Sequence, residues 1–282
     1  MLGVFDSGVG GLNVLAAIRR RLPRLSVLYL GDSARNPYGN RDRDVITGYT
    51  KECCLHLFER GCSLILLACN TVSAETLRTL QQEWLPEIRN RFDRPLNIIG
   101  VIRPLAEEAA KISKTGRIAV VGTRSTIESK TYEKELTALR GDIRVISRAC
   151  PLLVPLVEEG WIDKPETRRI LRTYLLPLKA ENPDVLILGC THYEAMHHLF
   201  RAKMGRHCTV LSTPSVVSEK LGLYLERHPE YTMSLDGKMT FLTTGDPARF
   251  AEIGSRFFGG SMENVARTSV LPHFDLALQS AS

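Results

Sequence analysis

Short runs of apolar residues alternate along the chain with longer segments in which apolar residues recur every three or four positions. The short runs are typical of buried strands, and the longer segments are typical of amphipathic helices. The first series predicts strands at residues 2–5, 26–30 and 64–68, with helices at 12–20 and 44–59 between them. This alternation predicts an α/β fold with mainly parallel sheets.

A second series of the same kind begins near Ile98. It predicts strands at 118–121, 144–146 and 185–188, with helices near 128–139 and 167–176. The rest of the chain predicts a helix near 216–226, a strand at 239–243 and a helix near 247–258. A chain of 282 residues with two such series is long enough for two modest domains.

The two series share a short sequence pattern. LILLACNT at residues 64–71 and VLILGCTH at residues 185–192 are each a predicted buried strand that ends in a cysteine, Cys69 or Cys190. GVFDSG at 3–8 has a looser counterpart in AVVGT at 119–123. The pattern favours a duplication that gives two pseudo-symmetric halves, with chance similarity between apolar strands as the alternative.

The composition is that of a globular protein, with 44% apolar and 24% charged residues. The longest uninterrupted apolar run, at 64–69, has six residues, whereas a membrane-spanning helix needs about twenty. The first residues lack the pattern of a secretory signal, so we expect a cytoplasmic protein without a membrane segment. The formal charge is +6, but the arginine clusters lie along predicted helices, where solvated arginines are common, so nucleic-acid binding is not favoured.

The seven cysteines are expected to be free thiols, because their number is odd and no secretory signal precedes them. The chain has no Cys-x-x-Cys pair and no zinc-finger spacing of cysteine and histidine, so we expect no metal site. Free cysteine packs like a small apolar residue. We therefore assign five of the cysteines to the core: Cys53, Cys54, Cys62, Cys150 and Cys208.

Polar residues directly follow several predicted strands. Ligands of open parallel sheets bind beyond the carboxyl ends of the strands, so we expect a site built from residues 6–8, 69–71 and 190–192 and the loop 31–39. A cysteine at such a position faces the positive end of a helix dipole, which is expected to lower its pKa toward neutrality. If the two halves pack face to face, Cys69 and Cys190 lie on opposite sides of one cleft.

Two opposed bases suit the inversion of a stereocentre by proton transfer. One base removes a proton from one face while the other, protonated, delivers a proton to the opposite face. A thiolate and a thiol can exchange these roles without a metal or a nicotinamide. Positioned proton transfer contributes only about 10² to 10⁴ in rate, so donors that stabilise the developing charge are also needed. Candidates for these donors are Ser7, Asn70, Thr71 and Thr191.

Two ionisable residues flank the candidate bases. Asp6 either holds a substrate ammonium group or assists the neighbouring cysteine, and His192 either exchanges protons with Cys190 or keeps it ionised. Structural roles stay open as well, because Asp6 suits a turn and Thr191 with Glu194 matches a capping box. GVGGLN at 8–13 resembles part of a dinucleotide-binding fingerprint, but its third glycine is missing.

Five further motifs carry a resemblance to a known family. VFDSGVGGL, GDSARNPYG, ACNT, CPLLVPLVEEG and LGCTHY occur in this order and together resemble bacterial glutamate racemases of the aspartate/glutamate racemase family. The similarity runs from residue 3 to about 265, and the segment beginning at Cys150 favours glutamate over aspartate and hydantoin racemases. It implies two pseudo-symmetric, doubly wound α/β domains, residues 1–97 plus 212–282 and residues 98–211, with the active site in the cleft between them.

The resemblance also implies roles for particular residues. The catalytic cysteines correspond to Cys69 and Cys190, Asp6 assists the first, His192 assists the second, and Glu158 orients or tunes the second side. Substrate-binding positions correspond to Asp6, Ser7, Tyr38, Gly39, Asn70, Thr71, Thr191 and His192.

The implied activity is cofactor-independent interconversion of L-glutamate and D-glutamate, which supplies D-glutamate for peptidoglycan synthesis and so maintains cell shape. Racemisation of aspartate by the same chemistry is the alternative. Family members commonly form homodimers and some bind DNA gyrase, and the sequence leaves both partners open. Three departures from the usual pattern, at Asn13, at 194–195 and at 212–215, fall outside the matched catalytic positions.

Overall fold

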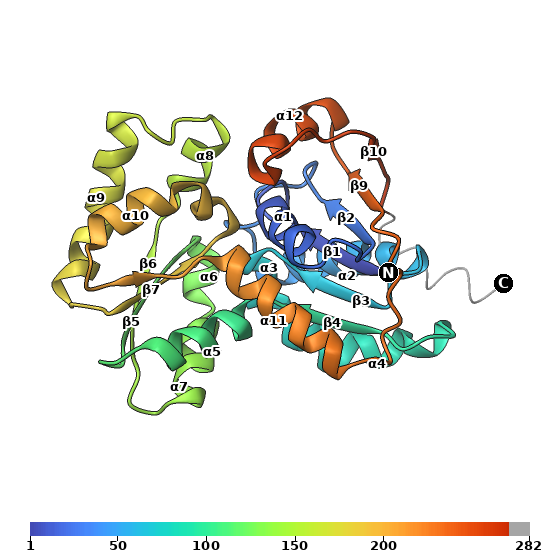
Figure 1. The fold of residues 1–282 in the computed structure, drawn as a ribbon, viewed down its shortest axis with the longest axis horizontal. Coiled ribbons are helices and arrows are strands. Elements are labelled where there is room, and N and C mark those ends of the chain that lie inside the picture. The colour runs from blue at the N-terminus through green and yellow to red at the C-terminus, as the bar shows by residue number, and fades with distance from the viewer. Residues whose placement is uncertain (271–282) are drawn as a thin grey trace.

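The computed structural model describes residues 1–270 and arranges them around two parallel sheets (Figure 1). The first sheet has six strands in the order β10-β9-β2-β1-β3-β4, and the second has four in the order β6-β5-β7-β8. The first contains β1 (Leu2–Asp6), β2 (Val27–Gly31), β3 (Leu64–Leu67), β4 (Asn97–Gly100), β9 (Met239–Thr243) and β10 (Val265–Arg267). The second contains β5 (Arg117–Gly122), β6 (Arg144–Ala149), β7 (Val185–Gly189) and β8 (Thr209–Val210). The predicted α/β fold with parallel sheets is confirmed.

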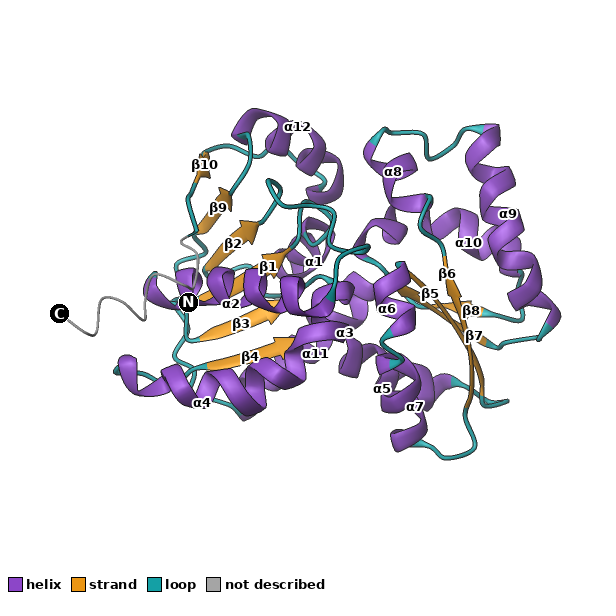
Figure 2. Cartoon of the chain, turned by 180° about the vertical axis from the view of Figure 1, so that it is seen from behind, coloured by secondary structure: helices purple, strands orange, loops and turns teal. Residues whose placement is uncertain are grey.

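Helices cover both faces of each sheet (Figure 2). On the first sheet, one face packs against α2 (Arg43–Glu59), α3 (Asn70–Thr79), a π-helical turn η1 (Leu80–Trp84) and α4 (Leu85–Ile88), which the short η2 (Arg89–Arg91) follows. The other face packs against α1 (Leu12–Arg21), α11 (Thr213–Arg227) and α12 (Pro247–Phe258). Both faces are therefore buried, which is why the strands are continuous apolar runs.

The second sheet is covered in the same way. One of its faces carries α8 (Leu153–Glu158), α9 (Pro165–Ala180), η3 (Thr191–Met196) and α10 (His197–Met204). The other carries α5 (Ile102–Ile112) and α7 (Thr131–Leu139), and the short α6 (Arg124–Glu128) follows β5. Helix α11 contacts both α1 and α5, so it packs against helices of both sheets.

The two sheets repeat one strand arrangement. Strands β2-β1-β3-β4 lie in the same order as β6-β5-β7-β8, with the first strand of each series between the second and the third. The cysteine strands β3 and β7 therefore occupy equivalent places. Cys190 follows β7 directly, Cys69 follows β3 after Ala68, and both stand at the N-cap of the next helix.

Two predicted elements differ from the structure. The helix expected at 128–139 begins only at Thr131, as α7, and the separate short α6 precedes it, because Lys130 between them adopts a left-handed conformation with φ 54°. The strand near Ile98, expected to open the second series, pairs with β3 in the first sheet.

The proposed domain boundary at residues 97 and 98 cuts through β4, whose four residues all belong to the first sheet. Strands β9 and β10 join the same sheet after the second series. The division at 97/98 and 211/212 stays a prediction, and residues 271–282 of the first proposed domain lie outside the described residues. Within residues 1–270, no helix is long and apolar enough to cross a membrane.

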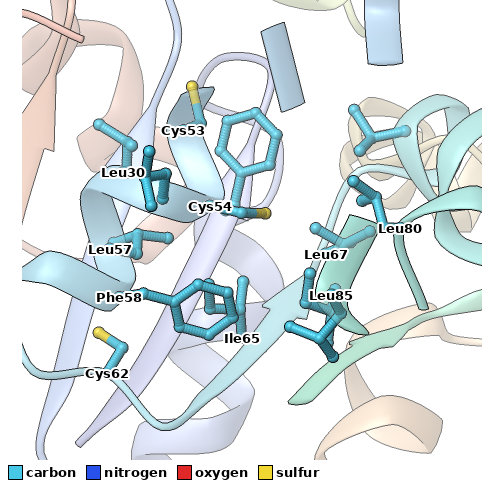
Figure 3. Packing of buried hydrophobic residues seen from close by; sticks show 14 of the residues in the cluster. Leu30, Cys53, Cys54, Leu57, Phe58, Cys62, Ile65, Leu67, Leu80 and Leu85 are labelled. Atoms are coloured by element: carbon cyan, nitrogen blue, oxygen red, sulfur yellow. The ribbon is translucent and has the colours of Figure 1, made fainter. Parts of the chain in front are cut away.

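The cysteines assigned to the core are buried free thiols. Figure 3 shows Cys53, Cys54 and Cys62 among leucine, isoleucine and phenylalanine side chains on one face of the first sheet. Cys150 and Cys208 belong to a core cluster on the second sheet. All five side chains lie in apolar cores, as small hydrophobic residues do, although Cys150 directly follows β6 and Cys53 accepts a hydrogen bond from Arg35 Nη2 at 3.4 Å.

Candidate active site

The carboxyl ends of β1, β3 and β7 open into a cleft of about 550 Å³ between the two sheets. The cleft is lined by both candidate thiols and by most of the site residues predicted from the sequence. These are Ser7, Tyr38, Gly39, Cys69, Asn70, Thr71, Glu158, Cys190, Thr191 and His192. Asp6 lies beneath this surface and is fully buried.

On the first side of the cleft, Cys69 stands between β3 and the start of α3. Its Sγ lies 3.4 Å from the hydroxyl oxygen of Ser7, which can donate a hydrogen bond to it. Burial, together with the negative charge of Asp6, raises the pKa of Cys69 to about 12, against the hydrogen bond from Ser7. The expected lowering by the helix dipole was wrong for this thiol, because the loss of solvent at the sulfur outweighs the dipole.

The Asp6 carboxylate is only partly satisfied. The Gly8 backbone N–H donates to Oδ2 at 2.9 Å, while Oδ1 has no hydrogen-bond partner among residues 1–270. Burial raises the pKa of Asp6, although the positive charge of His192 opposes that shift. Asp6 is thus a buried carboxyl with a free oxygen, electrostatically coupled to groups from both sides of the cleft.

On the second side, Cys190 lies between β7 and η3. Its Sγ is 4.0 Å from His192 Nδ1, and the other ring nitrogen, Nε2, is 3.0 Å from Glu158 Oε1. Burial lowers the pKa of His192, but the hydrogen bonds and charges of Cys190 and Glu158 outweigh it and raise the pKa to about 10. The Glu158 pKa is lowered: burial raises it, and the His192 hydrogen bond and charge more than offset that. His192 is therefore protonated at neutral pH and holds a positive charge beside Cys190.

The loop 31–39 crosses from the first sheet to this second side. Asn36 Nδ2 donates to Glu158 Oε1 at 3.4 Å, and buried Asp32 anchors the loop by accepting from Arg35 Nε at 2.6 Å and Thr244 Oγ1 at 2.7 Å. The Tyr38 hydroxyl also donates to Asp32. Tyr38 therefore offers its ring and backbone, rather than its hydroxyl, to the cleft.

Three threonine hydroxyls meet where the two halves touch. Thr71 Oγ1 lies 2.9 Å from Thr123 Oγ1 and 3.1 Å from Thr126 Oγ1. Gly39 also lies against Thr123. A Cβ added at Gly39 would lie 2.9 Å from Thr123 Cβ, so this close approach requires glycine. Sequence reasoning missed Thr123, although it ends the AVVGT segment that corresponds to the strand before Ser7.

Thr191 and His192 lie close to residues 8–13, which form the turn after β1 and the start of α1. A Cβ at Gly10 would lie 2.2 Å from Thr191 Oγ1, so only glycine allows this approach. Asn13 Nδ2 donates to the Thr191 carbonyl at 2.6 Å. The capping box was wrong: Cys190 occupies the N-cap, and Glu194 accepts hydrogen bonds from Ser212 Oγ and the Thr213 N–H instead.

Within residues 1–270, no cluster of three or more histidine, cysteine, aspartate or glutamate side chains has the arrangement of a metal site.

Two similar α/β halves that meet at a cleft with a thiol on each side have the arrangement expected of a racemase that uses two cysteines. The sequence profile of the Asp/Glu/Hydantoin racemase family matches residues 13–217. The chain belongs to this family, and it is an isomerase.

Relatives in curated collections and solved structures agree with this membership. The glutamate racemase of Caulobacter sp. is 39% identical over 277 residues, which span 93% of this chain and 98% of the relative. The crystal structure of glutamate racemase isoform RacE1 from Bacillus anthracis superimposes with a TM-score of 0.86 at 34% identity and covers 96% of this chain and 97% of that one. The Francisella tularensis glutamate racemase, solved in complex with D-glutamate, has a TM-score of 0.83 at 27% identity, with 95% and 97% covered.

Proposed function

We propose that the chain interconverts L-glutamate and D-glutamate, with Cys69 and Cys190 acting on opposite faces of the α-carbon. Glutamate racemisation is the activity of its relatives at 35–39% identity, which span 87–95% of the chain. One observation carries the assignment of the bases. Each thiol follows an equivalent strand of one of two matching sheets, and both line the same cleft.

The two sides of the cleft differ in their electrostatics, which suits a reaction that needs one base and one acid at a time. The raised pKa keeps Cys69 protonated at neutral pH. Protonated His192 lies 4.0 Å from Cys190 Sγ, so a cation stands beside the sulfur to which we assign the role of base. Cys190 thus starts as the base and Cys69 as the acid.

In the reaction from this state, the Cys190 thiolate removes the α-proton and the electron pair stays on the substrate, delocalised into its α-carboxylate. The Cys69 thiol then donates its proton to the opposite face of the same carbon. Cys190 is left as a thiol and Cys69 as a thiolate, which is the state that catalyses the reverse reaction. Atoms and charge balance without an added reactant.

Asp6 supports the Cys69 side. Its carboxyl has a raised pKa and one free oxygen, so it is suited to receive the Cys69 proton or to hold the substrate ammonium group. Glu158 and His192 support the Cys190 side through their 3.0 Å contact. We assign substrate binding to the cleft residues Ser7, Tyr38, Gly39, Asn70, Thr71, Thr191 and His192, whose N–H and O–H groups can stabilise carboxylate charge.

D-Glutamate is a building block of peptidoglycan, so we propose that the chain supplies it for cell-wall synthesis in the cytoplasm. The substrate assignment competes with aspartate, which has the same reacting centre and a side chain shorter by one methylene group.

The decisive experiment incubates the purified protein with L-glutamate in D₂O, without added cofactor or metal. We expect the α-proton signal to disappear while the optical rotation decays to zero, and we expect Cys69→Ala and Cys190→Ala to abolish the decay. Exchange with aspartate but not glutamate would overturn the substrate. Racemisation that persists in either cysteine variant would overturn the assignment of the bases.

A further inference from the structure

We propose that Tyr132, on the second half of the molecule, is a positioning residue for substrate binding. Its hydroxyl fixes the side-chain amide of Asn70 so that the Nδ2 donor of Asn70 is presented to a substrate carboxylate. This inference rests on the proposed function, because it requires that Asn70 bind the substrate.

Tyr132 contacts residues next to both candidate bases. Its hydroxyl donates to Asn70 Oδ1 at 2.6 Å, and Asn70 directly follows Cys69. Its ring packs against Gly189, where an added Cβ would lie 3.1 Å from Tyr132 Cε2, and Gly189 directly precedes Cys190. Both Tyr132 and Asn70 are buried. One aromatic side chain therefore connects the two strand ends that carry the thiols.

The hydrogen bond determines which way the Asn70 amide points. A phenol O–H in a buried position needs an acceptor, and Oδ1 of Asn70 is the acceptor that the structure provides. Burial raises the pKa of Tyr132, so the phenol keeps its proton at neutral pH and remains a donor. Rotating the amide by half a turn would leave both the phenol proton and Oδ1 unpaired. The observed orientation is therefore the better satisfied one.

This orientation leaves a donor for a ligand. Asn70 Nδ2 is buried and has no hydrogen-bond partner among residues 1–270, yet Asn70 lines the cleft. Buried donors in native proteins are normally satisfied, so an unpaired one in a binding cleft is suited to a ligand acceptor. A carboxylate offers such acceptors, and glutamate carries two. Tyr132 thus acts through Asn70, without touching the substrate.

The test compares Tyr132→Phe, which removes only the hydroxyl, with the unaltered protein. Without the hydroxyl, the Asn70 amide can rotate, so we expect KM for both glutamate enantiomers to rise about tenfold while kcat changes less than about threefold. In Asn70→Ala, KM should rise at least as much, and adding Tyr132→Phe to that variant should have no further effect on KM. Asn70→Asp still accepts a hydrogen bond from Tyr132 but has no amide donor, so it should raise KM. This variant tests the Asn70 donor independently if Tyr132→Phe folds poorly.

A second tyrosine–asparagine pair supplies the matched control. Tyr224 accepts a hydrogen bond from Asn97 Nδ2 at 2.9 Å outside the substrate cleft, so Tyr224→Phe should leave KM unchanged. Thermal unfolding of each variant separates loss of fold from loss of binding.

The inference is overturned if Tyr132→Phe keeps the original KM while Asn70→Ala and Asn70→Asp raise it, or if the effects of Tyr132→Phe and Asn70→Ala add. Unchanged KM in Asn70→Ala would overturn the inference together with the assignment of Asn70 as a binding residue. Failure of the proposed function is a separate result, because the unaltered protein would then not racemise glutamate at all.

Discussion

His192 lies between a carboxylate and a sulfur, with Nε2 3.0 Å from Glu158 Oε1 and Nδ1 4.0 Å from Cys190 Sγ. The pKa of His192 is raised to about 10 because the contributions of Cys190 and Glu158 exceed the effect of burial. The His192 imidazolium therefore places a positive charge beside Cys190 at neutral pH. The activity should therefore also depend on Glu158, which holds His192 Nε2 at 3.0 Å and helps to raise the His192 pKa.

Replacement of Glu158 by glutamine should move the alkaline limb of the activity profile. The change removes a group that raises the pKa of His192, so that pKa should fall and the imidazolium should be lost at a lower pH. We expect kcat/KM to fall about tenfold at pH 8 and its alkaline limb to shift downward. Profiles of kcat/KM against pH check this, with Glu159→Gln, an exposed neighbour, as the control. An unshifted limb would contradict the role of Glu158.

The strand ends could be located from sequence because parallel buried strands are short, continuous apolar runs. Cys69 and Cys190 follow such runs directly, and the repeat of LILLACNT and VLILGCTH matches the equivalent places of β3 and β7. The break at Lys130 was not predicted, since a left-handed residue other than glycine has a weak local signal.

The side-chain contacts between the two halves could not be predicted from the sequence. Thr123 reaches Thr71, and Tyr132 reaches Asn70, across a sequence separation of 52 and 62 residues respectively. No periodicity encodes such contacts, because they depend on how two separately formed layers dock. The prediction of a lowered pKa for Cys69 was wrong for the same reason. Burial depends on the assembled cleft, whereas the helix dipole depends only on the local chain.

Asp6→Asn should separate stability from activity. A buried carboxylate with one unpaired oxygen destabilises the folded state at neutral pH, where the raised pKa opposes its ionised form. Because the folded pKa lies above the unfolded one, this destabilisation is present above the folded pKa and disappears at acid pH. We expect the free energy of unfolding at pH 7 to rise by about 1 kcal/mol while racemisation falls by about 10² or more.

Urea unfolding at pH 7 and pH 4, together with racemisation rates, measures both quantities for the Asp6 variant. The gain in stability should be larger at pH 7 than at pH 4. A variant that loses stability at pH 7, or keeps full activity, would contradict the role assigned to Asp6.

Alkylation at pH 8 should modify Cys190 before Cys69. With its pKa near 12, only about one Cys69 side chain in 10⁴ is a thiolate at that pH, and the thiolate is the reactive form. Cys190 faces the protonated His192. Brief treatment with iodoacetamide followed by peptide mass analysis checks the order, and saturating glutamate should protect both thiols. Equal rates at the two cysteines would contradict the difference between the two sides.

Cys54→Ala should reduce stability and spare the chemistry. Cys54 is fully buried on the face of the first sheet that packs against α2, among leucine and phenylalanine side chains, and no cleft residue depends on it for a hydrogen bond in the described part of the chain (Figure 3). Removing its sulfur leaves a small cavity, for which we expect a loss of about 1 to 2 kcal/mol in the free energy of unfolding. Because burial raises the pKa of the Cys54 thiol far above its usual range, the thiol is not ionised at neutral pH and has no role as a base. We expect kcat and KM at 25 °C within about twofold of the original values, measured beside a urea unfolding curve. A folded Cys54→Ala protein that cannot racemise glutamate would show that a third thiol takes part in the reaction.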